Sequence, residues 1–166
     1  MSSFSKEIKE WYTPLLGAYL LWQFTKGYES VGEQRSPEFL FHFVALPILE
    51  SPELSRPIHP QRKEFSSYVK SFAKDEKMDV LAKLNDKVFQ ERVNTWRALD
   101  IGCAAHLFEW KDEMTRVHAT RQEDDELVVR LSKPVRGLGA KAFRFGTWVA
   151  FVELPVFAGL LGVKLS

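Results

Sequence analysis

The sequence is poor in cysteine, in net charge and in signals for export. Cys103 is the single cysteine among 166 residues, which excludes an intramolecular disulfide and a Cys-based zinc ribbon and is typical of a reducing cytoplasm. Lys and Arg number 23 against 22 Asp and Glu, so the net charge of +1 gives no reason to expect a polyanion-binding protein. Residues 1–10 mix Lys with Glu and no small-residue cleavage site follows, so we expect no secretory signal.

The sequence also lacks the common catalytic motifs: it has no GxxxxGK[ST], GxGxxG, HExxH or GxSxG. Cys103 and His106 are three residues apart, a spacing that places a thiol and a base on one helix face. Because the neighbours of Cys103 are small or apolar, a buried and inert thiol is the favoured interpretation. We therefore expect a protein that is not an enzyme and has no catalytic, cofactor-binding or metal-ligating residue.

Hydrophobic residues, in contrast, are abundant, at 45% of the chain with 13% aromatic. The length suits one domain over residues 1–166 with a substantial core. Three runs are apolar on nearly every face: Pro14–Trp22, Phe39–Leu49 and Phe145–Val163. So much apolar surface in a small chain predicts that the N- and C-terminal helices contact partners. The last run has the length of a membrane span, but Glu153 would cost about 2–3 kcal/mol at its midpoint and Pro155 breaks the helix. We predict two shorter helices that meet at Leu154–Pro155, and no membrane association.

The hydrophobic periodicity predicts a mainly α fold in three parts: N-terminal helices over 3–74, a winged-helix-like centre over 78–121 and a C-terminal helical segment over 127–166. Several breaks are expected from local signals. Pro14 should restart the first helix and Gly27 should end it. Ser36 before Pro37 should cap the next helix, which should end or kink near Pro47.

In the centre, a helix over 96–107 is followed by alternating residues that predict a β-hairpin, with strands at 108–110 and 114–118. The order of helix, break, helix and hairpin is that of a winged helix-turn-helix. Such a wing would present Arg97, Lys111 and Arg116 to the phosphates of DNA. Acidic residues in the same region would repel phosphate, so a wing that contacts protein is an equally good interpretation.

The charges are unevenly distributed along the chain. Residues 127–166 carry +5 and residues 1–126 carry −4, with an acidic run at 123–126 at the boundary. A solvated acidic loop beside a basic helix is the ordinary interpretation of this pattern. The alternative is a dipolar surface that orients the protein against a partner.

Four groups of residues, spread in order through the chain, resemble the middle-component proteins of three-component ABC ATPase systems. The first group opens the chain's first apolar helix: Pro14, Gly17, Ala18, Leu20, Leu21, Trp22, Phe24, Gly27 and Tyr28. The second is the step Leu46, Pro47, Ile48 and Leu49, and the third is Ala98, Leu99 and Gly102 before the hairpin. The fourth closes the chain: Lys141, Ala142, Gly146, Trp148, Leu161, Gly162 and Val163.

The resemblance implies a function and partners. In these systems an SMC/Rad50-like ABC ATPase, a middle component and a variable effector, commonly a nuclease, are encoded together, and Lamassu-type anti-phage systems belong to the group. The chain would be a cytoplasmic, non-catalytic accessory subunit that bridges or regulates the ATPase and its nuclease-like effector, with a DNA contact within the complex. The alternative from another class is a stand-alone winged-helix DNA-binding regulator.

Three residues are candidate partner contacts. Trp22 and Trp148 are large aromatic side chains in apolar helices, of the kind that dominate interfaces, although Trp148 is also favoured as a core residue. Glu153 is a carboxylate among apolar neighbours. It would either face solvent or pair with Lys141 or Arg144, or else anchor a basic residue of a partner.

Overall fold

The computed structural model describes residues 3–31, 35–120 and 131–165, with side chains from Pro14 onward. The acidic run at 123–126 and the segment 127–130 lie outside the described residues. The fold is mainly helical with one short hairpin, as predicted. The helices before the hairpin are α1 (Ser3–Ser30), α2 (Phe39–Glu50), α3 (Pro52–Ser55), α4 (Phe65–Lys74), α5 (Met78–Ala82), α6 (Leu84–Gln90) and α7 (Arg92–Ala104). The strands β1 (Phe108–Lys111) and β2 (Arg116–Ala119) follow, and then α9 (Lys133–Val149) and α10 (Leu154–Leu161).

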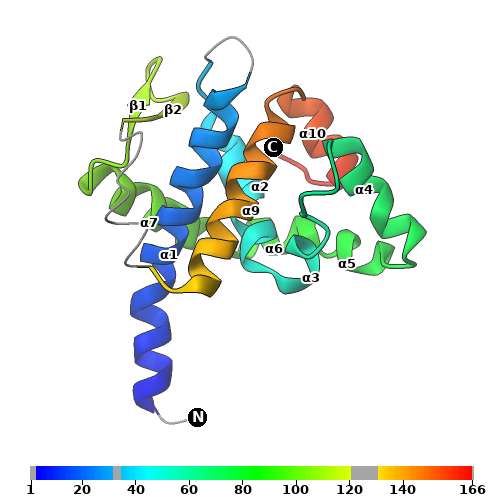
Figure 1. The fold of residues 1–166 in the computed structure, drawn as a ribbon. Helices are drawn as coiled ribbons and strands as arrows, with labels where there is room; N and C mark the ends of the chain where they lie inside the picture. The colour runs from blue at the N-terminus through cyan, green and yellow to red at the C-terminus, as the bar shows by residue number, and fades with distance from the viewer. Residues whose placement is uncertain (1–2, 32–34, 121–130, 166) are drawn as a thin grey trace.

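The centre of the fold is the pair α1 and α9, which lie side by side and run in the same direction (Figure 1). Two glycines allow their backbones to approach. A Cβ atom at Gly27 would lie 2.0 Å from the carbonyl oxygen of Phe143, and one at Gly146 would lie 2.1 Å from that of Phe24. Gly27 therefore does not end α1, as its sequence position predicted; it lies inside the helix, where it makes room for α9.

We expected too little interior to bury the three apolar runs together, and hence N- and C-terminal helices that contact partners; for most residues of these runs this is wrong. In α2 the nine consecutive residues from Phe41 to Leu49 are buried. Aromatic rings from α1, α2, α4, α9 and α10 pack together, with centroids 6.0 Å apart for Phe24 and Phe145 and 5.2 Å apart for Phe65 and Phe157. Most residues of these runs are buried because the runs pack against one another.

Two prolines lie inside helices where breaks were predicted. α1 continues through Pro14, and α2 continues through the buried Pro47 to Glu50. Around Pro47, burial of the surrounding apolar side chains outweighs the lost backbone hydrogen bond, which by itself costs about 3 kcal/mol in a helix interior.

Ser36 does not cap α2, contrary to the prediction. Its hydroxyl instead donates to Oε2 of Glu29 at 2.8 Å, and the carbonyl of Pro37 accepts from Val117 N at 3.0 Å. The helix begins only at Phe39. The same Ser-Pro pair does start a helix at Ser51, whose hydroxyl accepts from Leu54 N at the beginning of α3.

The hairpin pairs Phe108 with Ala119 and Lys111 with Arg116, in antiparallel register. Its second strand is not a free edge. The segment before α2 hydrogen-bonds along it, through Phe39 N to Thr115 O at 3.0 Å and through the Val117 bond given above. The predicted wing is thus present as a hairpin, packed beside the C-terminal end of α1 (Figure 1).

The last apolar run forms the end of α9 and all of α10, as the predicted pair of helices, and the break between them at residues 150–153 lies directly before the Leu154–Pro155 step. Among the described residues, no single helix is long and apolar enough to cross a membrane. The two helices pass that test of length and composition only as a pair, and they are bent by 117° relative to each other.

Candidate functional site

The two tryptophans chosen from the sequence lie in the core. Trp22 is 0% exposed and Trp148 is 5% exposed. The Trp148 ring packs with centroid distances of 6.2 Å to Tyr68 and 6.4 Å to Phe145. The preference for Trp148 as a core residue is confirmed, and neither indole has an exposed face for a partner.

The three candidate DNA contacts are not equivalent. Arg97 and Lys111 are exposed. The side chain of Arg116 is only 20% exposed, and it lies 3.8 Å from Glu38 and 3.6 Å from Asp112 in ion pairs. It also donates to the carbonyl of Ser36 at 2.6 Å. Arg116 therefore holds the hairpin to the segment before α2. This differs from the prediction, in which its guanidinium was presented to phosphates.

The pairing of Cys103 with His106 fails on geometry. α7 ends at Ala104, and His106 lies beyond it with φ of 58°, so the two side chains do not share a helix face. In the described part of the chain the hydrogen bond between them is a backbone one, from His106 N to the carbonyl oxygen of Cys103 at 3.1 Å, and none joins the two side chains. Burial, followed by the charge of Asp100, raises the pKa of the Cys103 thiol, which makes the thiolate less available.

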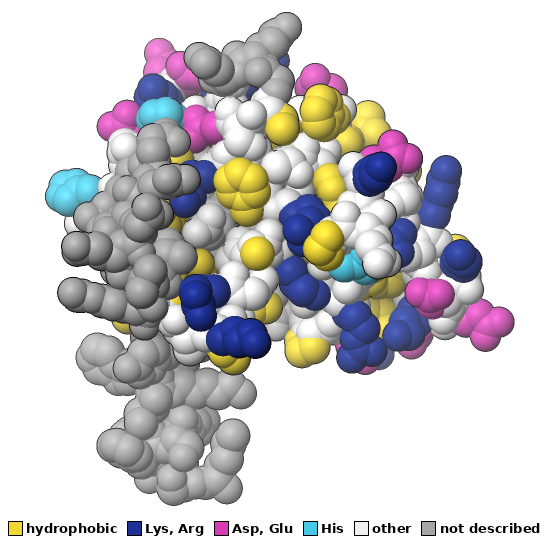
Figure 2. Space-filling view, viewed as in Figure 1, with side chains coloured by type: hydrophobic (Ala, Val, Ile, Leu, Met, Phe, Trp, Pro, Cys, Tyr) yellow, Lys and Arg dark blue, Asp and Glu magenta, His cyan; other side chains and the backbone are white. Residues whose placement is uncertain are grey.

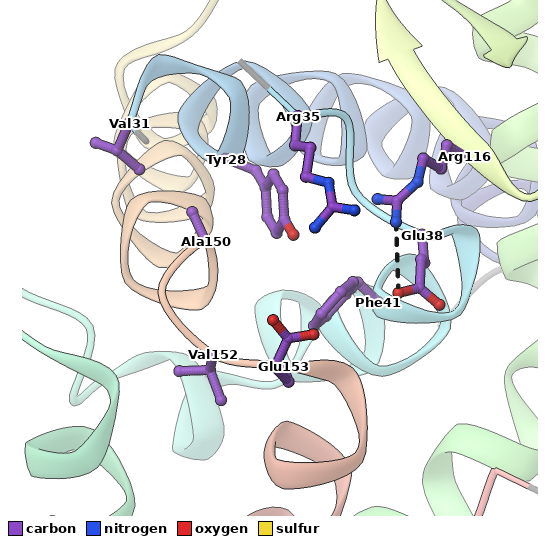
Figure 3. Close-up of a pocket in the computed structure, with 9 residues that line it drawn as sticks. All are labelled: Tyr28, Val31, Arg35, Glu38, Phe41, Arg116, Ala150, Val152 and Glu153. Carbon is purple, nitrogen blue, oxygen red and sulfur yellow. Dashed lines mark ion pairs between the residues drawn. The ribbon is translucent and has the colours of Figure 1, made fainter. Parts of the chain in front are cut away.

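Two of the candidate residues, Glu153 and Arg116, meet in one pocket of about 190 Å³ (Figure 3). The pocket lies where the C-terminal end of α1, the N-terminal end of α2, β2 and the α9–α10 turn come together. Figure 3 shows the Tyr28 ring and the Arg35 guanidinium pointing into it, with the Glu153 carboxylate facing them from the start of α10. The remaining lining residues are Val31, Glu38, Phe41, Ala150 and Val152.

The charges in this pocket are mixed in sign and partly unpaired. Burial raises the pKa of Tyr28, and the carboxylates of Glu38 and Glu153 raise it further, against the opposing effect of Arg116 and Arg35. Within the described residues neither Arg35 nor Glu153 forms an ion pair. The predicted pairing of Glu153 with Lys141 is not formed, since Lys141 donates to the carbonyl of Ser55 at 3.0 Å.

Next to this pocket, Glu29 makes a cluster of contacts that the sequence did not reveal. Its Oε2 lies 2.6 Å from Nδ1 of His118 and accepts from Ser36, while its Oε1 accepts from Ala119 N at 2.8 Å. Glu29 thus ties α1, the segment before α2 and β2 together. No local signal marks it, because His118 and Ala119 are about ninety residues away in the chain.

A second concave region of about 680 Å³ lies between α1, α2, α3 and α9. Apolar side chains such as Leu16, Leu20 and Pro47 form part of its walls. Charged side chains, among them Lys87, Glu91 and Lys141, form another part, and Glu50 lies between the two. No hydrogen bond or ion pair from a described residue reaches the Glu50 carboxylate. Burial, with the charge of Glu91 adding to it, raises the pKa of Glu50 to about 7.

We expect Glu50 to make the stability of the fold depend on pH. Its pKa is higher in the folded chain than the ordinary value of 4.5, so its stabilising contribution is complete below pH 4.5 and is lost as the pH rises through about 7. Glu50→Gln, which resembles the protonated form, should raise the free energy of unfolding by about 2 kcal/mol at pH 8, after allowance for partial exposure, and leave it unchanged at pH 4.5.

Melting curves at the two pH values test this, with a rise of roughly 4–8 °C expected at pH 8 only. Glu53→Gln is the control, because Glu53 is exposed on the adjacent helix α3. Equal melting temperatures for wild type and Glu50→Gln at pH 8 would show that the Glu50 carboxylate is well solvated.

Within the part of the chain that the structure describes, no three His, Cys, Asp or Glu side chains are grouped so that they could hold a metal ion. The molecule is thus a mainly helical protein, and its polar side chains line pockets between its secondary-structure elements or lie on charged surfaces. It belongs to the Middle Component 3 family of ABC-three component (ABC-3C) systems, whose family model matches residues 1–165. No curated protein and no solved structure gives a significant match. Membership implies the other subunits of the system as partners.

Proposed function

We propose that the chain is the non-catalytic accessory subunit of a cytoplasmic anti-phage defence complex of the Lamassu type, and that it links or regulates an SMC-like ABC ATPase and a nuclease-like effector. Family membership supports the presence of partner subunits. The bridging role rests on one observation: the α9–α10 turn presents an apolar and acidic surface that no described residue covers.

The turn carries exposed apolar side chains that the rest of the fold does not use. Phe151 is 76% exposed, Val156 54% and Leu160 47%. Val156 and Leu160 are four residues apart and therefore lie on one face of α10. Glu153, exposed and unpaired in the described chain, stands between Phe151 and this face. Exposed aromatic and aliphatic side chains are the usual anchors of a protein interface, and a charge beside them adds specificity for the partner.

We expect Glu153→Gln to weaken partner binding without changing the fold. The substitution keeps the shape of the side chain and removes its charge, so it should lower affinity for the partner by roughly fivefold, about 1 kcal/mol, and reduce the salt dependence of binding. The melting temperature should stay within 1 °C or so, because an exposed substitution of this kind costs less than about 0.5 kcal/mol. The measurement is titration against the co-purified ATPase and effector encoded beside the chain.

Glu64 offers a matched control. Both Glu64 and Glu153 are exposed N-cap residues whose side chains make no capping hydrogen bond, at the start of α4 and α10 respectively. Glu64→Gln should leave binding unchanged. If Glu153→Gln binds both partners with the affinity and salt dependence of wild type, Glu153 is not a contact; if neither subunit co-purifies with the wild-type chain, the bridging role itself is wrong.

A further inference from the structure

The outer surface of α9 is strongly basic. Its 17 residues include four cations, Lys133, Arg136, Lys141 and Arg144, and no acidic residue. Lys133 and Arg144 are separated by about three turns of helix, so they share a face, and Arg136 and Lys141 lie on either side of the line between them. The opposite side of the helix is buried through residues such as Ala142, Gly146 and Val149.

Among the described residues, no ion pair neutralises the cations on this face, and the acidic run at 123–126 lies outside those residues. Lys141 donates to Ser55 O at 3.0 Å, which places the end of α3 and the following Arg56 beside α9. The pKa of Lys141 is lowered, first by burial and then by the positive charges of Arg144 and Arg56. No ion pair within the described residues involves any of these side chains. Figure 2 shows Lys and Arg side chains spread over this side of the molecule, with acidic side chains at its edges.

The surface between the cations is open to close approach. Gly137 and Ala140 are exposed on the same side of α9, and no atom of a described residue lies within 4 Å of where a Cβ atom at Gly137 would be. A rise of about 1.5 Å per residue separates Lys133 from Arg144 by about 16 Å, the axial length of about five phosphates on one strand of a duplex.

We propose that this face, made of Lys133, Arg136, Arg144 and Arg56, binds the phosphodiester backbone of a nucleic-acid duplex without reading its sequence. Phosphate contacts are made by cations on an open surface, whereas the core of a protein interface centres on aromatic and aliphatic anchors. Apart from Phe143, which is 36% exposed on α9, the exposed large apolar side chains of the C-terminal region lie at the α9–α10 turn and on α10, at Phe151, Val156 and Leu160. The site is distinct from the predicted wing and does not rest on the proposed bridging role.

The test is fluorescence anisotropy of the full chain with a labelled 30-base-pair DNA duplex, at salt concentrations from about 50 to 200 mM. The variant Lys133→Ala/Arg136→Ala/Arg144→Ala removes three exposed or half-exposed cations and keeps Lys141, which has a structural contact. Each phosphate contact contributes a slope of about 0.9 in log affinity against log salt, so the variant should reduce the slope by about 2–3. Affinity at the lowest salt should fall at least tenfold, with an unchanged melting temperature.

Arg97→Ala/Lys111→Ala, which removes two exposed cations near the hairpin, is the matched control and should change affinity less than twofold. Two unrelated duplex sequences should bind equally, and RNA and DNA duplexes of one sequence will identify which backbone is preferred. The proposal is overturned if the wild type shows no salt-dependent binding, or if the control variant loses binding while the α9 variant keeps it. It is also overturned if poly-L-glutamate displaces the duplex as well as unlabelled duplex does, since the face then fits an acidic protein.

Discussion

Gly146→Ala is expected to destabilise the chain by about 3 kcal/mol and to lower its melting temperature by roughly 6–12 °C. The added methyl group would stand 2.1 Å from the carbonyl oxygen of Phe24 and 2.8 Å from the amide nitrogen of Tyr28. Both atoms belong to the backbone of α1, so they cannot move aside as the end of a flexible side chain would. Alanine favours a helix over glycine by about 1 kcal/mol, which is too little to offset the separation of α1 from α9.

Gly159→Ala is the control for this experiment. Gly159 lies within α10, is exposed, and has nothing within 4 Å of its Cβ position. The same substitution should therefore stabilise the chain by about 0.5–1 kcal/mol. Thermal or urea unfolding of both variants measures the two changes in the free energy of unfolding. If Gly146→Ala melts at or above the wild-type temperature, the close crossing of the two helices is not maintained in solution.

Trp148→Ala is expected to cost about 3–5 kcal/mol, enough to leave much of a marginally stable chain unfolded. The indole is 5% exposed and packs against the rings of Tyr68 and Phe145, so its removal leaves a cavity between α4 and α9. Partner binding should be lost with the fold and not independently of it.

Phe151→Ala is the control for Trp148→Ala, at a nearby position where the aromatic side chain is exposed. Its ring is 76% exposed, so its removal should change the free energy of unfolding by less than about 0.5 kcal/mol. Circular dichroism melts of Trp148→Ala and Phe151→Ala make the comparison. A Trp148→Ala chain with the wild-type melting temperature would contradict the core position of this side chain.

The features that the sequence predicted correctly are those set by local chemistry and by periodicity. The alternation at 108–110 and the turn expected at 111–113 predict the hairpin, although β1 extends one residue further, through Lys111. The Leu154–Pro155 step predicts the bend after α9. Alternating residues act locally, and Pro155 coincides with the start of α10, whereas Pro14 and Pro47 lie inside helices, so proline alone does not locate a break.

The features that the sequence did not reveal depend on contacts between distant segments. Gly27 has the sequence signature of a helix end, but it is used for the approach of Phe143, more than a hundred residues later. Arg116 has the signature of a phosphate contact, but Glu38 and the carbonyl of Ser36 bind it. The pocket around Glu153 is likewise assembled from four separate elements, so no linear motif describes it.

The pairing of α1 with α9 also has a consequence for synthesis on the ribosome. About a hundred residues separate the end of α1 from the start of α9. At about 5–20 residues per second, roughly 5–20 s pass between the emergence of these two helices. During that time the apolar side of α1, which includes Leu20 and Phe24, has not yet met its principal neighbour. The apolar side of α1 therefore stays without this neighbour until α9 has emerged, and we expect chaperones to bind the nascent chain during that time.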